Sequence, residues 1–367
     1  MKIGANSSSR DRIPYVDNLR WFGIVLVYLG HFLDKLIPSG YSEYLWLHNF
    51  IYSFHMPLFF FLSGIFWKPE NSSTKKIVGR AVILLVPAMF WSFAYLPFNL
   101  ATMSQAEFFN TLARYPFGHF DFFHPSWFLV CLFMVEVILS MFSRILKGLV
   151  TFTSRIVLIV SAFLIGFIFD VYQPLFQEIT SLEVSFWYLG EAFPAIGFYL
   201  AGSILKDDLK AERKSSISSM LVLLVIISIW MLSSKWMIGS WVETNIYIDM
   251  SVRQYGNYFG FIALAFLGIA SSFLLFRLRQ LKSKLLRFVG ENSVVFYLLN
   301  GLNIFVLDNF VLALGWVPTN PIPVFLFSIG YAIASQIAFI PLAYLLIRYS
   351  PLLVGRYKFA KLSPSGM

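Results

Sequence analysis

Residues 17–35, "DNLRWFGIVLVYLGHFLDK", combine a long apolar run with several ionisable side chains. The segment is apolar and long enough to form a helix across a bilayer, which takes about 20 residues. It nevertheless carries Asp17, Arg20, His31 and Asp34. At about 100° per residue, the steps from Arg20 to His31 end about 20° past three full turns, so the four polar side chains share one stripe. Along the helix axis, Arg20 and His31 lie about 16 Å apart.

The composition extends this membrane interpretation to the whole chain. Of 367 residues, 58% are hydrophobic and 13% are charged, whereas about a quarter of the residues in soluble domains are charged. We therefore predict an all-α polytopic membrane protein whose surroundings are the lipid bilayer. About ten transmembrane helices are expected, at residues 19–38, 47–67, 80–100, 126–145, 155–173, 184–205, 217–238, 257–276, 291–314 and 323–347.

The basic residues predict the orientation. Of the 28 Lys and Arg residues, 23 fall in the two termini and in alternate connectors, and three fall in the other connectors. The positive-inside rule then places both termini in the cytoplasm. We expect a cytoplasmic segment 1–18, a membrane domain 19–347 and a cytoplasmic tail 348–367, in the cytoplasmic (inner or plasma) membrane. Topology accounts for the net charge of +9, so no nucleic-acid partner is predicted. Residues 1–18 lack the apolar region of a cleavable signal peptide.

This orientation gives each polar side chain a depth. Arg20, Lys76 and Arg80 fall at the inner face. All five histidines fall in the outer half of the bilayer or outside it: His31, His48, His55, His119 and His124. The asymmetry predicts a cationic site open to the cytoplasm and a histidine-rich site open to the other face.

Simpler interpretations exist for three of these residues. Arg20 begins the span, and its side chain can extend to the inner headgroups. Asp17 can stabilise the helix N-terminus, and His31 can form a hydrogen bond between helices. Ionisable groups inside spans are costly and tend to mark function, so the shared stripe favours a functional site.

No metal site is predicted. Neither HxxxH nor HExxH spacing occurs, and the single Cys131 excludes a cysteine cluster and an intramolecular disulfide.

Four segments, in order along the chain, resemble the acyltransferase 3 family of integral-membrane O-acyltransferases. They are "YVDNLRWFGIVLVYLGHF" (15–32), "FHMPLFFFLSGIFW" (54–67), "HPSWFLVCLF" (124–133) and "GENSVVFYLLN" (290–300). Within the family, the chain looks closest to stand-alone carbohydrate acetylases of the fucose 4-O-acetylase type. One motif departs from the family: an Arg-x-x-Arg pair is expected before Pro87, but after Arg80 the position of the second arginine is occupied by Ile83. Lys76, one turn earlier, is the candidate replacement cation.

The resemblance implies transfer of an acyl group, most often acetyl, from cytoplasmic acyl-CoA to a carbohydrate hydroxyl. The carbohydrate would be O-antigen, capsule or exopolysaccharide. Arg20, Lys76 and Arg80 suit the phosphates of acetyl-CoA. A histidine is the usual general base near neutral pH, which makes His31 the leading catalytic candidate.

Further site residues follow from the same interpretation. Asp34, one turn above His31, or the more distant Asp17 would hold the imidazole, and His55 is an additional catalytic candidate. Acceptor-binding candidates are His48, His119, Asp121, His124, Trp127 and Glu191. Direct transfer and a transient acyl-histidine both stay open. The alternative function is a transporter or flippase for a polar lipid or glycan, which would also place polar groups in its spans.

Overall fold

The computed structural model describes residues 13–68, 74–100, 103–145, 151–180, 185–205, 217–279, 281–318 and 320–356. Within these ranges the chain is helical, with no β-strand beyond one isolated bridge between Asp249 and Gln254. The all-α prediction is therefore confirmed. The outermost parts of both predicted cytoplasmic termini, and the basic connector at 206–214, lie outside the described residues.

Eight of the predicted spans are helices long and apolar enough to cross a bilayer, in a search limited to the described residues. They are α1 (Pro14–Leu36), α4 (Thr74–Leu100), α6 (Trp127–Ile145), α7 (Phe152–Val171), α11 (Ile217–Glu243), α12 (Tyr258–Leu278), α14 with α15 (Ser293–Leu302, Asp308–Ala313) and α16 with α17 (Pro321–Ala338, Ile340–Tyr349).

The other two predicted spans are also helical but shorter. Segment 47–67 divides into α2 (Leu45–Tyr52) and α3 (His55–Gly64). Pro57 lies in the first turn of α3, where its missing N–H is tolerated, and Phe54 before it has a non-helical φ of −140°. Segment 184–205 contains α9 (Leu189–Ile204). The number of membrane crossings and the side of the termini stay predictions.

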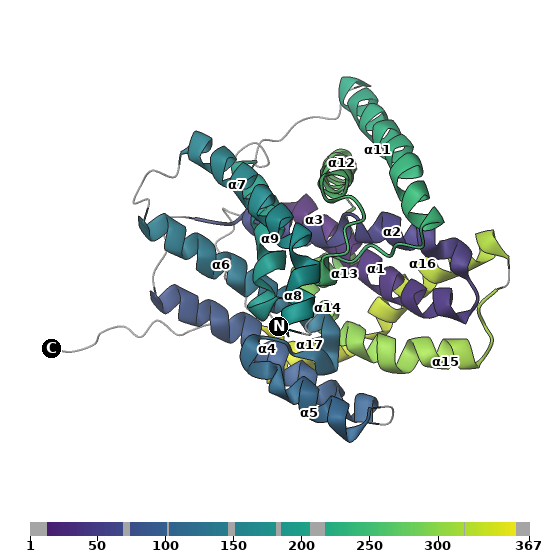
Figure 1. The fold of residues 1–367 in the computed structure, drawn as a ribbon. Coiled ribbons are helices and arrows are strands. Elements are labelled where there is room, and N and C mark those ends of the chain that lie inside the picture. The colour runs from purple at the N-terminus through teal and green to yellow at the C-terminus, as the bar shows by residue number, and fades with distance from the viewer. Residues whose placement is uncertain are drawn as a thin grey trace.

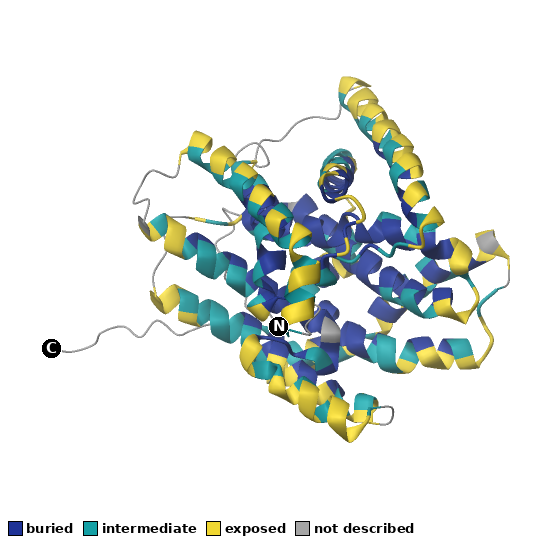
Figure 2. Cartoon of the chain, viewed as in Figure 1, coloured by how far each residue is buried: buried dark blue, intermediate teal, exposed yellow. Residues whose placement is uncertain are grey.

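Helix α1 lies at the centre of the bundle (Figure 1). It packs against α3, α12, α13 (Lys284–Glu291), α14 and α16. Leu19, Ile24, Tyr28 and Phe32 on α1 are fully buried, and Figure 2 shows the same concentration of buried residues. The Tyr28 hydroxyl donates to the Phe296 carbonyl oxygen at 2.9 Å, which ties α1 to α14. Helix α1 is therefore an interior helix; on its polar stripe, Asp17 is buried and Arg20, His31 and Asp34 are partly buried.

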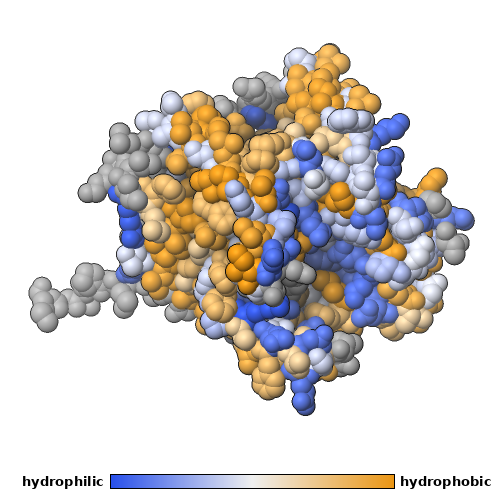
Figure 3. All heavy atoms as spheres, in the orientation of Figure 1, coloured by the Kyte–Doolittle hydropathy of each residue, from blue (hydrophilic) through white to orange (hydrophobic). Residues whose placement is uncertain are grey.

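The outer helices expose large apolar side chains. On α11, Ile217 is 80% exposed and Leu232 is 68% exposed. Figure 3 shows hydrophobic side chains over α11, α7 and α6, with hydrophilic ones gathered near the centre of this face. In water such surfaces would be costly, but hydrocarbon solvates them. The chain is an integral membrane protein.

The connector between α4 and α6 is anchored to the bundle. It contains α5 (Gln105–Ala113), and Tyr115 follows this short helix. The Ser92 hydroxyl on α4 donates to the Phe120 carbonyl oxygen at 2.7 Å and lies 2.6 Å from the Tyr115 hydroxyl. Burial raises the pKa of Tyr115 to about 12, so the phenol stays protonated. The connector therefore packs onto α4.

Two glycines allow α3 and α9 to touch at the backbone. A Cβ atom on Gly64 would lie 1.7 Å from the Tyr199 carbonyl oxygen, and one on Gly202 would lie 2.0 Å from that of Phe61.

We expect Gly64→Ala to destabilise the protein by about 3 kcal/mol, because a backbone contact must open. Thermal unfolding of the purified protein in detergent measures this. Gly239→Ala is the matched control, since a Cβ there meets nothing within 4 Å. Equal melting temperatures for the two variants would contradict the prediction.

Candidate active site

His31 and Asp34 form a pair on the C-terminal half of α1. The two residues are three positions apart in a helix, so their side chains lie on the same face. His31 Nδ1 lies 3.1 Å from Asp34 Oδ2. The carboxylate accepts, so Nδ1 carries the proton and Nε2 keeps its lone pair. Their side chains are 23% and 38% exposed, which leaves the pair accessible.

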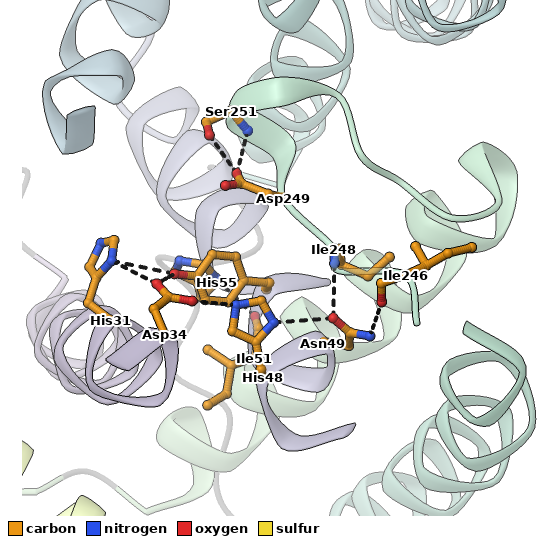
Figure 4. Close-up of polar contacts among 11 residues, drawn as sticks. His31, Asp34, His48, Asn49, Ile51, His55, Ile246, Ile248, Asp249 and Ser251 are labelled. Carbon is orange, nitrogen blue, oxygen red and sulfur yellow. Dashed lines mark hydrogen bonds and ion pairs between the residues drawn. The ribbon is translucent and has the colours of Figure 1, made fainter. Parts of the chain in front are cut away.

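Helix α2 brings two more groups to the same carboxylate. The Tyr52 hydroxyl donates to Asp34 Oδ2 at 2.6 Å, and His48 Nε2 lies 2.8 Å from Asp34 Oδ1. Figure 4 shows His31 and His48 on either side of Asp34. Three donors on one carboxylate stabilise its ionised form and fix its orientation.

The side chain of Asn49 fixes the other side of the His48 ring. The Asn49 amide group donates to the Ile246 carbonyl oxygen at 2.8 Å, and its Oδ1 accepts from the Ile248 N–H at 2.9 Å. Oδ1 also lies 3.2 Å from His48 Nδ1. His48 thus links Asp34 to Asn49 and, through Asn49, to the loop that follows α11.

A small cavity, which we name the outer cavity after the predicted orientation, adjoins His31. Its volume is about 30 Å³, room for roughly one water molecule or one hydroxyl group. Its lining residues include His31, Tyr52, Trp127, Asp249, Ser251 and Tyr297. His55 lines it too, with Nδ1 3.0 Å from the Ile51 carbonyl oxygen. A reacting hydroxyl fits this cavity, and a whole sugar ring does not.

A second, larger cavity, which we name the inner cavity, lies near the start of α1. Its volume is about 390 Å³, and Arg20, Lys68, Lys76 and Arg80 are among its lining residues. The starts of α1 and α4 and the end of α6 meet here, as the predicted alternation of the spans requires. The cavity is thus cationic and lies on the side predicted to face the cytoplasm.

Two cations of the inner cavity, Arg80 and Arg20, have specific partners. Arg80 makes two contacts of 2.5 Å with the carboxylate of Glu136 on α6. Arg20 lies over the Phe66 ring, 5.3 Å from its centroid, and 3.9 Å from Asp17. Asp17 therefore accompanies Arg20 at the inner end of α1, and Asp34 is the carboxylate beside His31.

The two cavities have no lining residue in common. Gly23 lies between Arg20 and His31 on the stripe of α1, and a Cβ on Gly23 would lie 2.7 Å from the Phe59 ring. The ring of Phe59 is also 5.9 Å from that of Phe128. The ring of Phe59 therefore packs against α1 at Gly23, a position between Arg20 and His31.

The structure brings only some of the predicted acceptor-binding residues to the outer cavity. Trp127 lines it, and His48 lies behind Asp34. His119 is fully buried, with Nε2 3.0 Å from the Ser185 carbonyl oxygen. Neither His119 nor Asp121 lines either cavity. The side chain of His124 is outside the described part of the structure.

Glu191 also lies away from both cavities. It is fully buried, it accepts from the Ser185 hydroxyl at 2.6 Å, and it lies 3.6 Å from Arg253 Nε. This contact holds the loop that follows α11 against α9. The structure therefore supports a structural role for Glu191 and gives no support for acceptor binding.

Sequence reasoning missed Tyr52, Asp249 and Ser251 in the outer cavity and the partner role of Glu136 in the inner one. Glu136 had a signal, because a lone carboxylate inside a span needs a cation. Asp249 and Ser251 had none, since they lie in a short polar connector.

These features define a class: an integral membrane protein with a histidine–aspartate pair and a cationic cavity on one central helix. An acyltransferase domain, that of the acyltransferase 3 family, matches residues 13–340. The chain belongs to this family and is a membrane acyltransferase, as the sequence motifs indicate.

Two curated relatives resemble short parts of the chain. Nodulation protein NolL of Mesorhizobium japonicum is 40% identical over 74 residues, which cover 18% of this chain and 20% of that protein. Nodulation protein NolL of Sinorhizobium fredii is 37% identical over 93 residues, 24% of this chain and 25% of that protein. The chain thus matches about a fifth to a quarter of the length of these relatives. No solved structure matches it.

Proposed function

We propose that this acyltransferase moves an acyl group, most simply acetyl, from cytoplasmic acyl-CoA to a hydroxyl of a cell-surface or secreted carbohydrate. One observation carries the proposal. The same stripe of α1 supplies Arg20 to a cationic cavity of about 390 Å³ and His31 to a separate cavity that accepts one hydroxyl. A polyanionic donor and a neutral hydroxyl acceptor suit these two environments. O-antigen, capsule and exopolysaccharide are the acceptor candidates, and the cytoplasmic (inner or plasma) membrane is the proposed location.

The outer cavity supports general-base chemistry. His31 Nε2 takes the proton of the acceptor hydroxyl as its oxygen attacks the thioester carbon. The new C–O bond forms, the C–S bond breaks, and the proton passes from His31 to the departing CoA sulfur. Asp34 stabilises the imidazolium that forms between these steps. We favour this direct transfer over an acyl-histidine, because it needs one step where the relay needs two; in both, Asp34 bonds to Nδ1 of His31 and leaves Nε2 to react.

The inner cavity supports donor binding. Phosphates pair well with Arg and Lys, and Arg20, Lys76 and Arg80 line one space. The slim pantetheine arm would then extend along α1 past Gly23, where the ring of Phe59 packs. This path carries the thioester from the cationic cavity to His31.

Surface glycans test the proposed function. Cells without the gene, and cells complemented with the wild type, are compared by mass spectrometry of their glycans. A mass increment of one acyl group that is lost on deletion and restored by the wild type is expected, and it identifies the acyl group. Glycans of unchanged mass but altered amount at the surface would instead favour the transporter or flippase.

Substitutions of Arg80 and of Glu136 are expected to change the affinity for acetyl-CoA in opposite directions. Arg80→Gln should weaken acetyl-CoA binding about 10-fold, because a charge-assisted contact is lost. Glu136→Gln should strengthen it, since Arg80 is then released from its carboxylate partner. Binding of radiolabelled acetyl-CoA to purified protein measures both. Lys235→Gln, an exposed position on α11, controls for the loss of one positive charge. A change of the same sign in both variants, or no change, would argue against phosphate binding at Arg80.

A further inference from the structure

The loop after α11 contributes three consecutive residues to the wall of the outer cavity. They are Asp249, Met250 and Ser251, opposite His31 and far from it in sequence. Figure 4 shows Asp249 and Ser251 on a separate segment that passes over the His31–Asp34 cluster. None of the family-like motifs includes this loop. It is therefore a component of the site that the chemistry of His31 does not yet explain.

The loop is held rigidly. The side chain of Asn49 binds it through Ile246 and Ile248. Asp249 and Gln254 exchange two backbone hydrogen bonds of 2.9 Å, and Gln173 donates to the Val252 carbonyl oxygen at 2.8 Å. These hydrogen bonds hold the backbone of the loop in place at the cavity wall.

The Asp249 carboxylate is only partly used by these contacts. Its Oδ1 accepts from the Ser251 N–H at 2.8 Å and from the Ser251 hydroxyl at 2.6 Å. This fixes the carboxylate at the cavity wall, where the side chain is half-buried. Oδ2 retains acceptor capacity. Hydroxyl groups are donors of the kind that such an oxygen binds.

We propose that Asp249 selects the acceptor. It accepts a hydrogen bond from a second hydroxyl of the acceptor, next to the hydroxyl that His31 deprotonates. The substrate class is thus a sugar with two neighbouring hydroxyls, one inside the small cavity and one at Asp249. The ring itself stays outside the cavity, which has room for only about one hydroxyl group. This inference rests on the proposed carbohydrate acylation and adds the group that recognises the sugar.

The test compares two acceptors that differ by one hydroxyl. Methyl α-L-fucopyranoside has three consecutive ring hydroxyls, and its 3-deoxy counterpart has no neighbouring pair. Purified full-length protein is given acetyl-CoA with either probe, and acylated product is measured by mass spectrometry. We expect the wild type to favour the fucoside about 30-fold, because a site built for a hydroxyl is left unpaired by the deoxy probe.

The variant Asp249→Asn keeps an oxygen for the two Ser251 contacts but replaces the charged acceptor. The preference should fall to about 3-fold, through slower acylation of the fucoside, with the deoxy rate unchanged. Glu243→Gln, an exposed carboxylate just before the same loop, should keep the full preference. The acylation rates of the fucoside and of the deoxy probe are measured separately, and their ratio reports recognition of the second hydroxyl.

Several results would overturn this assignment. An equal fall of both rates in Asp249→Asn would make Asp249 a structural residue, and an unchanged ratio would remove it from recognition. A wild type that acylates the cells' own glycan but neither probe would overturn the acceptor class. If the cells' own glycan carries no acyl group that depends on the gene, the proposed function itself fails, and the glycan experiment reports that separately.

Discussion

Replacing His31 by alanine is expected to lower acyl transfer by about 10²- to 10⁴-fold, the usual contribution of a positioned general base. The physical reason is that an alcohol is a poor nucleophile until its proton is removed. His31 Nε2 is the ring nitrogen left open at the cavity once Nδ1 has bonded to Asp34. Acetyl-CoA binding should not change, because His31 does not line the inner cavity.

The measurement combines two readouts on the purified variant: the rate of acylation of the glycan acceptor, and the affinity for acetyl-CoA. Tyr41→Phe serves as the control. It also removes one polar contact near the outer end of α1, from the Tyr41 hydroxyl to the Pro318 carbonyl oxygen, but it touches neither cavity. A folded His31→Ala protein that transfers at the wild-type rate would refute the assignment. Loss of acetyl-CoA affinity in this variant would show that the two cavities are not independent.

Much of this site is readable from local sequence. Arg20 and His31 share a stripe because helical geometry places them there, and the three-residue spacing puts Asp34 beside His31. Hydropathy likewise finds the long helices, since length and apolarity are properties of one segment. The features that sequence predicts correctly are those that one helix determines alone.

Contacts between distant segments were not predictable in the same way. Hydropathy alone does not reveal the break between α2 and α3, because the break leaves the apolar run continuous. That break turns His48 and Tyr52 toward Asp34. Asp249 reaches the cavity only through a loop that Asn49 holds nearly 200 residues away along the chain. Long-range packing, not local pattern, completes the site.

The second large effect is expected for Asp34→Asn, which should lower transfer about 10²- to 10³-fold. The carboxylate accepts from three donors, those of His31, His48 and Tyr52. An amide has one acceptor oxygen and brings an N–H₂ group of its own, so at least one of the three partners faces a donor. The imidazolium that forms on His31 then loses the charge that stabilises it, and His48 loses its carboxylate partner.

Tyr52→Phe separates the charge of Asp34 from its hydrogen bonds. It removes one donor but keeps the carboxylate between the two histidines, so a loss of only about 10-fold is expected. Transfer rates and melting temperatures of both variants are measured together. If Asp34→Asn transfers as well as Tyr52→Phe at equal stability, the negative charge has no role beyond orientation. If Asp34→Asn is much slower while acetyl-CoA binding is retained, the charge acts on the transfer step itself, where a cation must form on His31.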